Sequence, residues 1–158
     1  RQTCIRELFT AAKHAKPMFE TVVNDLVECM DNRAISLIAP LKKMFRVLQK
    51  AATTTSGFDR TCDIVRGSIK CSSMPDIKIV LENLVKFQAA RRVRLVRIKN
   101  RFKEPTDAGW ADLMINFVCL GGENADACCH VCEVQIVILS LMTGKGHYSC
   151  AVRKPKYC

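Results

Sequence analysis

The sequence has no apolar run approaching the roughly 18 residues that a helix needs to cross a bilayer, so it predicts no membrane-spanning segment. Residues 1–17 scatter Arg, Lys and Glu among apolar positions, and they do not resemble a signal peptide. Glycine-rich dinucleotide loops, a P-loop and a nucleophile elbow are absent, as are internal repeats and low-complexity tracts. The chain begins without Met, which leaves open that it is a domain cut from a longer protein.

Acidic residues are scarce. The chain has 25 Lys and Arg against 15 Asp and Glu, a net charge of +10 that predicts attraction to nucleotides, nucleic acid or an anionic surface. No acidic residue lies in the stretch 91–103, where the basic side chains partly alternate with apolar ones. These basic residues are Arg91, Arg92, Arg94, Arg97, Lys99, Arg101 and Lys103. The alternation predicts a basic strand, with an ordinary solvated face as the alternative interpretation.

The composition predicts one domain with a hydrophobic core. A chain of 158 residues is long enough for one such core, and side chains that are 49% hydrophobic and 25% charged are typical neither of a disordered protein nor of a membrane-embedded one. The order of predicted elements is three helices, a strand, a helix and three strands. The ranges are helices at 3–16, at 18–30 and from Pro40, a strand at 62–71, a helix from 72–75 to about 87, a basic strand at 91–100 and two strands within 109–137. This order predicts an α/β (α+β) fold with a mixed sheet of about four to five strands flanked by helices.

The stretch 109–137 predicts two strands joined by a turn rich in Gly, Asn and Asp. In each strand, apolar residues on one side alternate with residues of another kind on the second side. The core side has Ala111, Leu113, Ile115, Phe117, Cys132, Val134 and Ile136, and the second side has Trp110, Asp112, Met114, Asn116, Glu133 and Gln135. If the strands pair as a hairpin, two carboxylates, two amides and an indole share one sheet face. This set suggests a ligand or metal site, with an ordinary polar outer face as an equally open alternative.

Three further features are candidates for chemistry. Asp63 lies near the start of the strand 62–71, where a buried carboxylate requires a cation or hydrogen-bond donors. The predicted helix from Pro40 has Lys42, Lys43, Arg46 and Lys50 on one side, which face either solvent or phosphates. His147 is a candidate for phosphate binding or proton transfer, and a surface-loop histidine is the alternative.

The chain has ten cysteines, which we expect to be largely reduced because five of them lie in or beside apolar segments. These are Cys29, Cys62, Cys71, Cys119 and Cys132. Reduced thiols favour a reducing compartment, so we expect a cytoplasmic protein. The cluster of Cys119, Cys128, Cys129 and Cys132 leaves a zinc-stabilised interaction module as a weaker hypothesis, since no second clean CxxC pair follows.

The motifs DIVRGSI, RIKNRFKEP, GWADLMIN and EVQI, in this order after a lysine-bearing helix, resemble the synthetase domain of the RelA/SpoT family. The resemblance covers approximately Pro40 to Met142. It implies a nucleotidyltransferase-like fold, with an N-terminal helical segment at 1–38 and a synthetase domain at 39–158 in a single compact unit. It also implies Mg²⁺-dependent transfer of pyrophosphate from ATP to the 3′ hydroxyl of GDP or GTP, which makes an alarmone.

The resemblance also implies roles for particular residues. Asp63 matches the aspartate that binds magnesium, and Glu133 matches the glutamate that helps hold the metal and activate the attacking hydroxyl. Trp110 replaces a tyrosine that stacks on guanine. The expected phosphate ligands are Lys42, Lys50, Arg66, Lys99, Arg101 and Lys103, and Asp112, Asn116 and Gln135 are expected to line the same pocket.

Several positions depart from the family pattern. Pro40, Ala108, Ala111, Met114 and Val137 stand where the family has nucleotide-binding residues. The departures leave three interpretations open: altered substrates, weak activity, or a catalytically inactive domain that binds nucleotide or RNA through its basic strand. The sequence does not determine an oligomeric state.

Overall fold

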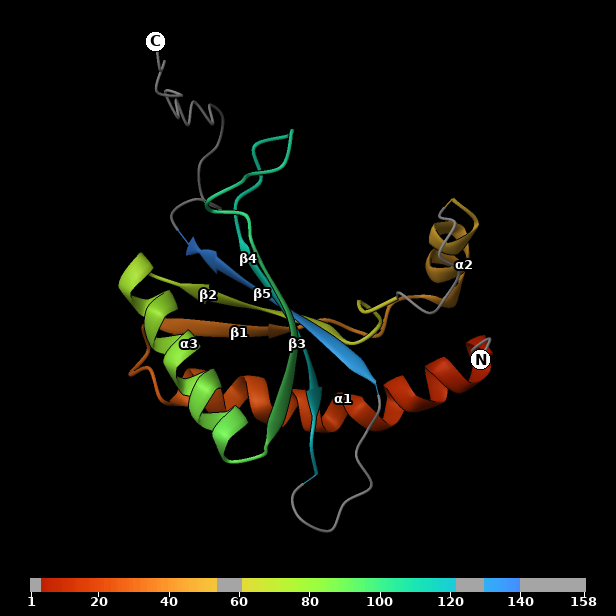
Figure 1. Cartoon of the computed structure of the whole chain (residues 1–158), viewed down its shortest axis with the longest axis horizontal. Coiled ribbons are helices and arrows are strands. Elements are labelled where there is room, and N and C mark those ends of the chain that lie inside the picture. The colour runs from red at the N-terminus through yellow and green to blue at the C-terminus, as the bar shows by residue number, and fades with distance from the viewer. Residues whose placement is uncertain (1–3, 54–60, 122–129, 140–158) are drawn as a thin grey trace.

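The structure is a computed structural model that describes residues 4–53, 61–121 and 130–139. The described elements follow one another in the order shown in Figure 1. They are α1 (Ile5–Glu28), β1 (Ala34–Ile38), α2 (Met44–Ala52), β2 (Arg66–Cys71), α3 (Met74–Ala89), β3 (Val93–Asn100), β4 (Leu113–Cys119) and β5 (Val131–Ile138). None of the described helices is long and apolar enough to cross a membrane.

The strands form a five-stranded mixed sheet in the order β1-β2-β5-β4-β3. β2 and β5 are parallel, whereas the other neighbouring pairs are antiparallel. α1 and α3 pack on one face of the sheet, while α2 stands apart from them (Figure 1). The predicted α/β fold, the hairpin of β4 and β5 and the basic strand are confirmed.

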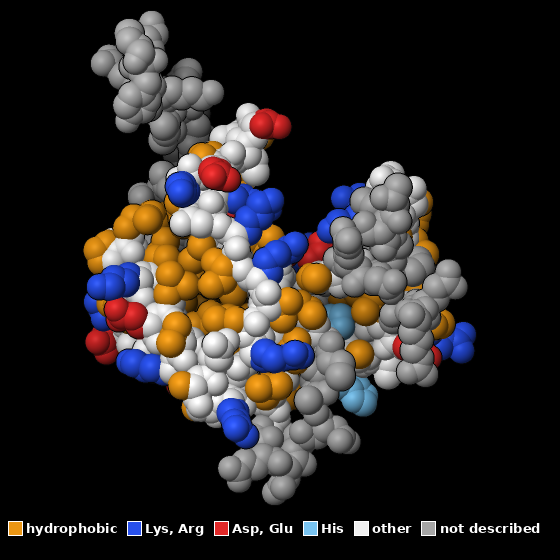
Figure 2. All heavy atoms as spheres, in the orientation of Figure 1, with side chains coloured by type: hydrophobic (Ala, Val, Ile, Leu, Met, Phe, Trp, Pro, Cys, Tyr) orange, Lys and Arg blue, Asp and Glu red, His pale blue; other side chains and the backbone are white. Residues whose placement is uncertain are grey.

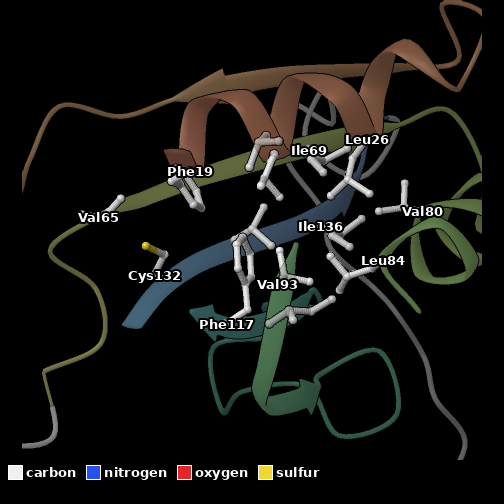
Figure 3. Close-up of a cluster of buried hydrophobic side chains, with 14 of the residues drawn as sticks. Phe19, Leu26, Val65, Ile69, Val80, Leu84, Val93, Phe117, Cys132 and Ile136 are labelled. Carbon is white, nitrogen blue, oxygen red and sulfur yellow. The ribbon is translucent and has the colours of Figure 1, made fainter. Parts of the chain in front are cut away.

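The core lies between the sheet and the two packed helices (Figure 3). Phe19 and Leu26 of α1 and Leu84 of α3 meet side chains from the strands, such as Phe117 and Ile136, and all of these are almost completely buried. The rings of Phe19 and Phe117 stack with centroids 5.7 Å apart. Burying this apolar surface is the main stabilising contribution to the fold, and it leaves the second face of the sheet available for polar residues.

Gly67 of β2 allows α1 to approach the sheet closely. A Cβ atom at this position would lie 3.0 Å from the carbonyl oxygen of Leu37 and 3.1 Å from Cε1 of Phe19. These distances are shorter than ordinary van der Waals contacts, so a larger residue would displace the Phe19 ring or β1. Glycine at this position therefore belongs to the packing of α1 against β1 and β2.

The prediction of two helices at 3–16 and 18–30 is wrong, because α1 continues through Pro17 as one helix. Proline lacks a backbone N–H and disfavours a helix interior. Pro17 is exposed, so water can hydrate the carbonyl that its missing N–H leaves unpaired. Buried residues on both sides of it, Ala12, Ala15 and Phe19, hold the two halves of the helix against one core.

The sequence analysis also missed β1 and placed other boundaries too early. Residues 34–38, the end of the segment predicted as helical, form an edge strand that pairs with β2. The third helix begins at Met44 and not at Pro40, and β2 begins at Arg66, so Asp63 precedes that strand. On α3, helical periodicity predicts Val85 on the core side with Val80 and Leu84, but Val85 is exposed.

Candidate active site

The polar face of the sheet brings together residues from four strands. Arg97 of β3, Asn116 of β4, Glu133 of β5 and Arg66 of β2 are successive register partners across the sheet. Side chains of register partners project to the same side. Arg97 donates a hydrogen bond from Nε to Asn116 Oδ1 at 3.0 Å. Glu133 and Asn116 are both buried, so this row places a carboxylate inside the face that the helices do not cover.

Asp63 is held beside this row by two lysines from another part of the chain. Lys42 donates a hydrogen bond from Nζ to Asp63 Oδ2 at 2.6 Å, and Lys50 does so at 3.2 Å. The backbone N–H of Lys42 also donates to the carbonyl of Ile64 at 3.0 Å, which fixes the segment before α2 next to Asp63. The other carboxylate oxygen, Oδ1, is buried and has no hydrogen-bond partner among the residues that the structure describes.

Asp63 and Glu133 line the same hollow, which has a volume of about 350 Å³. Its wall also contains Arg66, Gln135 and an apolar side from Leu37 to Ala39. Gln135 Nε2 donates a hydrogen bond to Glu133 Oε1 at 3.3 Å. The structure therefore brings together both carboxylates that the sequence singled out, with Arg66 and Gln135 on the same wall.

The two carboxylates have pKa values shifted in opposite directions. Burial raises the pKa of Asp63, but the hydrogen bonds and charges of Lys42 and Lys50 outweigh it, so that pKa lies below its ordinary value. Burial raises the pKa of Glu133, and the negative charge of Asp63 raises it further against the opposing effects of Asn116, Lys50 and Arg101. Asp63 is therefore held as an anion, while Glu133 has a higher affinity for a proton.

A second hollow of about 390 Å³ lies next to Asp63 along α2. It is lined by Lys42, Arg46, Gln49, Lys50 and Thr53. Figure 2 shows basic side chains on both sides of the notch beside α2, with an acidic side chain between them. Because Lys42 and Lys50 also contact Asp63, the cationic hollow adjoins the carboxylate hollow. Such an arrangement suits an anion that approaches a carboxylate-bound cation.

Trp110, Asp112 and Arg101 form a separate cluster beside the polar face. Arg101 Nη1 donates to both carboxylate oxygens of Asp112, at 3.1 and 3.2 Å, and Trp110 Nε1 donates to Asp112 Oδ2 at 2.9 Å. Asp112 is fully buried. Asp112 does not line the hollow of Asp63 and Glu133, and its carboxylate is instead enclosed by Arg101 and Trp110. Trp110 is 41% exposed.

The residues of the carboxylate hollow fit a magnesium ion. Mg²⁺ is bound through one or two carboxylates together with water and substrate phosphates, and Asp63 Oδ1 is a buried acceptor that no described residue hydrogen-bonds. Glu133 lines the same hollow. Among the described residues no group of three or more His, Cys, Asp or Glu side chains is arranged to hold a metal. The site therefore fits an ion that takes its remaining ligands from water and from the phosphates of a bound molecule.

Other predicted residues lie outside this arrangement. Lys99 is an exposed residue of β3, and Lys103 is exposed in the loop that follows. His147, Cys128 and Cys129 lie outside the described residues. Of the described cysteines, Cys71, Cys119 and Cys132 are buried, as expected of small apolar residues, but Cys29 is exposed.

The sequence analysis did not select Arg97 or Ser68 as site residues, and it named Arg46 only as one of four basic residues that face either solvent or phosphates. Arg97 contacts Asn116, Arg46 lines the cationic hollow, and Ser68 lines the carboxylate hollow. Arg97 and Lys99 are two residues apart in β3, so their side chains lie on the same face of the sheet. The alternation of the basic strand in the sequence is therefore a signal that could have identified Arg97. Arg46 lies four residues before Lys50, the spacing that puts two side chains on one helix face.

No protein-family model matches the sequence, and neither does any curated protein. Solved structures do match. The small alarmone synthetase 1 of Bacillus subtilis, bound to its product pppGpp, superposes with a TM-score of 0.62 at 19% identity over 85% of this chain and 70% of that chain. The small alarmone synthetase 2 of the same organism gives a TM-score of 0.66 at 18% identity over 87% and 73%.

The type VI effector Tas1, in complex with its immunity protein, gives a TM-score of 0.66 at 16% identity over 91% of this chain and 66% of that chain. At these identities the likeness concerns the fold. The chain has the fold of the small alarmone synthetases, and the RelA/SpoT-like architecture expected from the sequence is confirmed.

Proposed function

We propose that this domain transfers pyrophosphate from ATP to the 3′ hydroxyl of a guanosine nucleotide in a Mg²⁺-dependent reaction. The observation that carries the proposal is the position of Asp63 and Glu133 on one hollow, with a buried oxygen on Asp63 that no described residue hydrogen-bonds. Cationic side chains adjoin this hollow from α2. Hard oxygen ligands together with positive charge around phosphates are what phosphoryl-group transfer requires of a protein.

The residues divide the task by position. Lys42, Lys50 and Arg46 bind the phosphates of ATP in the cationic hollow, where lysines act as point charges and arginine can bind two oxygens. Asp63 and Glu133 would hold Mg²⁺, which when bound would neutralise phosphate charge and orient the transferred group. Glu133 accepts the proton of the attacking 3′ hydroxyl. AMP leaves as the new oxygen–phosphorus bond forms.

The acceptor nucleotide binds on the other side of Glu133. Trp110, which is partly exposed, supplies a stacking surface for the guanine of this nucleotide. Arg97 and Lys99 of β3 supply positive charge for the phosphates of the same nucleotide. Support comes from the similar structures: one is a small alarmone synthetase bound to its product pppGpp, and another is the same enzyme bound to AMPCPP. Arg101 is directed at Asp112 and contributes charge without direct contact.

The test incubates the purified domain with Mg²⁺, labelled ATP and GDP or GTP, and separates the products by chromatography. We expect a pyrophosphorylated guanosine product from the parent protein. Glu133→Gln is expected to lower the rate at least about 100-fold, the usual scale for a group that moves a proton, and Asp63→Asn is expected to lower the rate because it removes a ligand of the metal. Glu82→Gln, an exposed change on α3, serves as the matched control.

A rate in Glu133→Gln or Asp63→Asn equal to that of Glu82→Gln contradicts the assigned roles. Absence of product from a folded parent protein contradicts the reaction itself. The circular-dichroism spectrum and the melting temperature of each variant distinguish lost chemistry from lost fold.

A second candidate is a catalytically inactive domain that binds RNA through β3. The observation in its favour is that β3 is an edge strand of the sheet with Arg94, Arg97 and Lys99 exposed along it. Several positions where the family has nucleotide ligands also lack them, including Pro40 and Met114. Phosphate contacts by such residues give affinity that falls steeply with salt.

The RNA hypothesis predicts that the domain binds single-stranded RNA and that the logarithm of the association constant falls linearly with the logarithm of the salt concentration. Replacing Arg94 and Lys99 by Gln is expected to reduce the slope by about two, whereas Glu133→Gln leaves binding unchanged. Salt-independent binding, or none at low salt, contradicts this candidate.

A further inference from the structure

Asp112 is a buried charge whose partners are unusual for a residue at the start of a strand. It lies directly before β4, is 0% exposed, and accepts hydrogen bonds from Arg101 and from the indole N–H of Trp110. Its backbone carbonyl accepts a further hydrogen bond from the N–H of Arg101 at 2.8 Å. A buried carboxylate is costly unless it is paired and hydrogen-bonded, so this placement needs an explanation beyond packing.

The loop between Arg101 and Asp112 fixes the backbone of Trp110 as well as its side chain. The N–H of Trp110 donates to Thr106 Oγ1 at 3.1 Å, and its carbonyl accepts from the N–H of Thr106 at 3.1 Å. Gly109, at a φ of +77°, supplies the left-handed conformation that closes this turn. With backbone and indole N–H both held, the ring is ordered although 41% of the residue is exposed.

The cluster is continuous with the carboxylate hollow. Arg101 Nη2 lies 3.9 Å from Met114 Sδ, and Met114 is the register partner of Gln135, which hydrogen-bonds to Glu133. The positive charge of Arg101 also acts on Glu133, where it lowers the pKa of the carboxyl group against the larger effect of burial. An exposed ring that is held at the end of this series of contacts is a surface on which a nucleobase can stack without the entropic cost of immobilising the ring.

We propose that Asp112 is a positioning residue for the purine of the acceptor nucleotide: by accepting the Trp110 indole N–H while bound to Arg101, it holds the ring in the orientation that stacks on the base. This inference rests on the proposed function for the identity of the acceptor. It assigns Asp112 no contact with substrate, in accord with its complete burial. It also accounts for Arg101, which neutralises the buried carboxylate.

The test measures the Kd of GDP and, separately, of inorganic pyrophosphate by calorimetry for the parent and for Asp112→Asn, Trp110→Phe and Asp107→Asn. We expect Asp112→Asn and Trp110→Phe to weaken GDP binding about tenfold, the scale of a stacking contact, with pyrophosphate binding unchanged. Asp107→Asn is the matched control, since it removes the same charge from an exposed position of the same loop. We expect it to bind GDP as the parent does.

Trp110 is the single tryptophan of the chain, so its emission spectrum reports the ring directly. In Asp112→Asn we expect red-shifted emission and stronger quenching by iodide, because the ring loses its anchor. Trp110→Phe keeps the Arg101–Asp112 ion pair and decides the question if Asp112→Asn does not fold.

Unchanged GDP affinity in the folded variants overturns the inference, as does an equal loss of GDP and pyrophosphate binding, which would indicate a purely structural role. A parent protein that fails to bind GDP also overturns it. By contrast, GDP binding that depends on Asp112 without any turnover overturns only the proposed reaction and leaves the inference intact.

Discussion

Glu133 and Asp63 occupy one hollow but have opposite effects on the pH dependence of folding. The pKa of Glu133 is raised in the folded state by burial and by the charge of Asp63, so the folded protein binds this proton more tightly than the unfolded chain does. Stability therefore falls as pH rises from the ordinary glutamate pKa through the raised one. Ionising Glu133 therefore lowers the stability of the metal-free fold, as functional groups commonly do.

We accordingly expect Glu133→Gln to raise the melting temperature of the metal-free protein at pH 7 and to abolish its turnover. The gain should vanish below about pH 4.5, where the glutamate is neutral in both states. Melting curves in EDTA across this pH range measure the effect. A variant that is less stable than the parent at pH 7 would show that Glu133 is stabilised by its neighbours in spite of burial.

Asp63 has a lowered pKa because Lys42 and Lys50 outweigh the effect of burial. Its ionised form contributes stability that is complete above the ordinary aspartate pKa and is lost as pH falls through the lower folded value. Asp63→Asn leaves the half-buried ammonium group of Lys42 without its carboxylate.

We expect Asp63→Asn to lower the free energy of unfolding at pH 7 by about 1–3 kcal/mol, measured by urea denaturation. Asp31→Asn removes an aspartate that is 91% exposed at a 4.0 Å ion pair, and it should change stability by less than about 0.5 kcal/mol. Equal effects of the two changes would show that the Lys42–Asp63 pair contributes no more than a surface ion pair.

α1 and β1 show what a pattern of apolar residues leaves undecided about an element. Pro17 predicts a break between two helices, yet the apolar residues on its two sides share one core and keep α1 continuous. β1 was missed because apolar side chains occupy both of its faces: Ala34 is buried, while Ile35 and Leu37 are exposed. Neither period-2 nor helical spacing is clear in five such residues.

We predict that Pro17→Ala stabilises the protein by about 1–3 kcal/mol, because alanine restores a backbone hydrogen bond at an exposed helix-interior position. Pro75→Ala is the matched control: Pro75 lies in the first turn of α3, where proline is well tolerated, and we expect little change. Urea titrations of both variants measure the difference. A destabilised Pro17→Ala would indicate that α1 requires the proline for its packing.

As a whole molecule, the domain has two adjoining hollows, one lined by Asp63 and Glu133 and the other lined by Lys42 and Lys50 beside α2. α2 buries only Val47 of its described residues, so much of its position depends on the contacts of Lys42 and Lys50 with Asp63. A ligand that binds these lysines and a Mg²⁺ ion at Asp63 stabilises the folded state by mass action.

We expect ATP at 100 times its Kd, with Mg²⁺, to stabilise the parent by about 2.7 kcal/mol, a rise of roughly 5–10 °C in melting temperature for a domain of this size. In EDTA, or in Asp63→Asn, the Mg²⁺-dependent part of the rise should be absent. A thermal-shift titration with and without Mg²⁺ measures it. An equal rise in EDTA contradicts metal binding at Asp63.

The sequence by itself determined the β4–β5 hairpin, the basic strand, helix α3 and the class of the fold, because each depends on local periodicity, turn residues and burial of an apolar face. It also singled out Asp63 and Glu133, since carboxylates in apolar strands are conspicuous. Only the tertiary structure decided that these two side chains share a hollow, because they lie seventy residues apart and meet through the parallel pairing of β2 with β5. It likewise decided that Asp112 accepts hydrogen bonds from Trp110 and Arg101 and does not line the hollow. Hydrogen bonds between partners across a loop leave no periodic signal in a sequence.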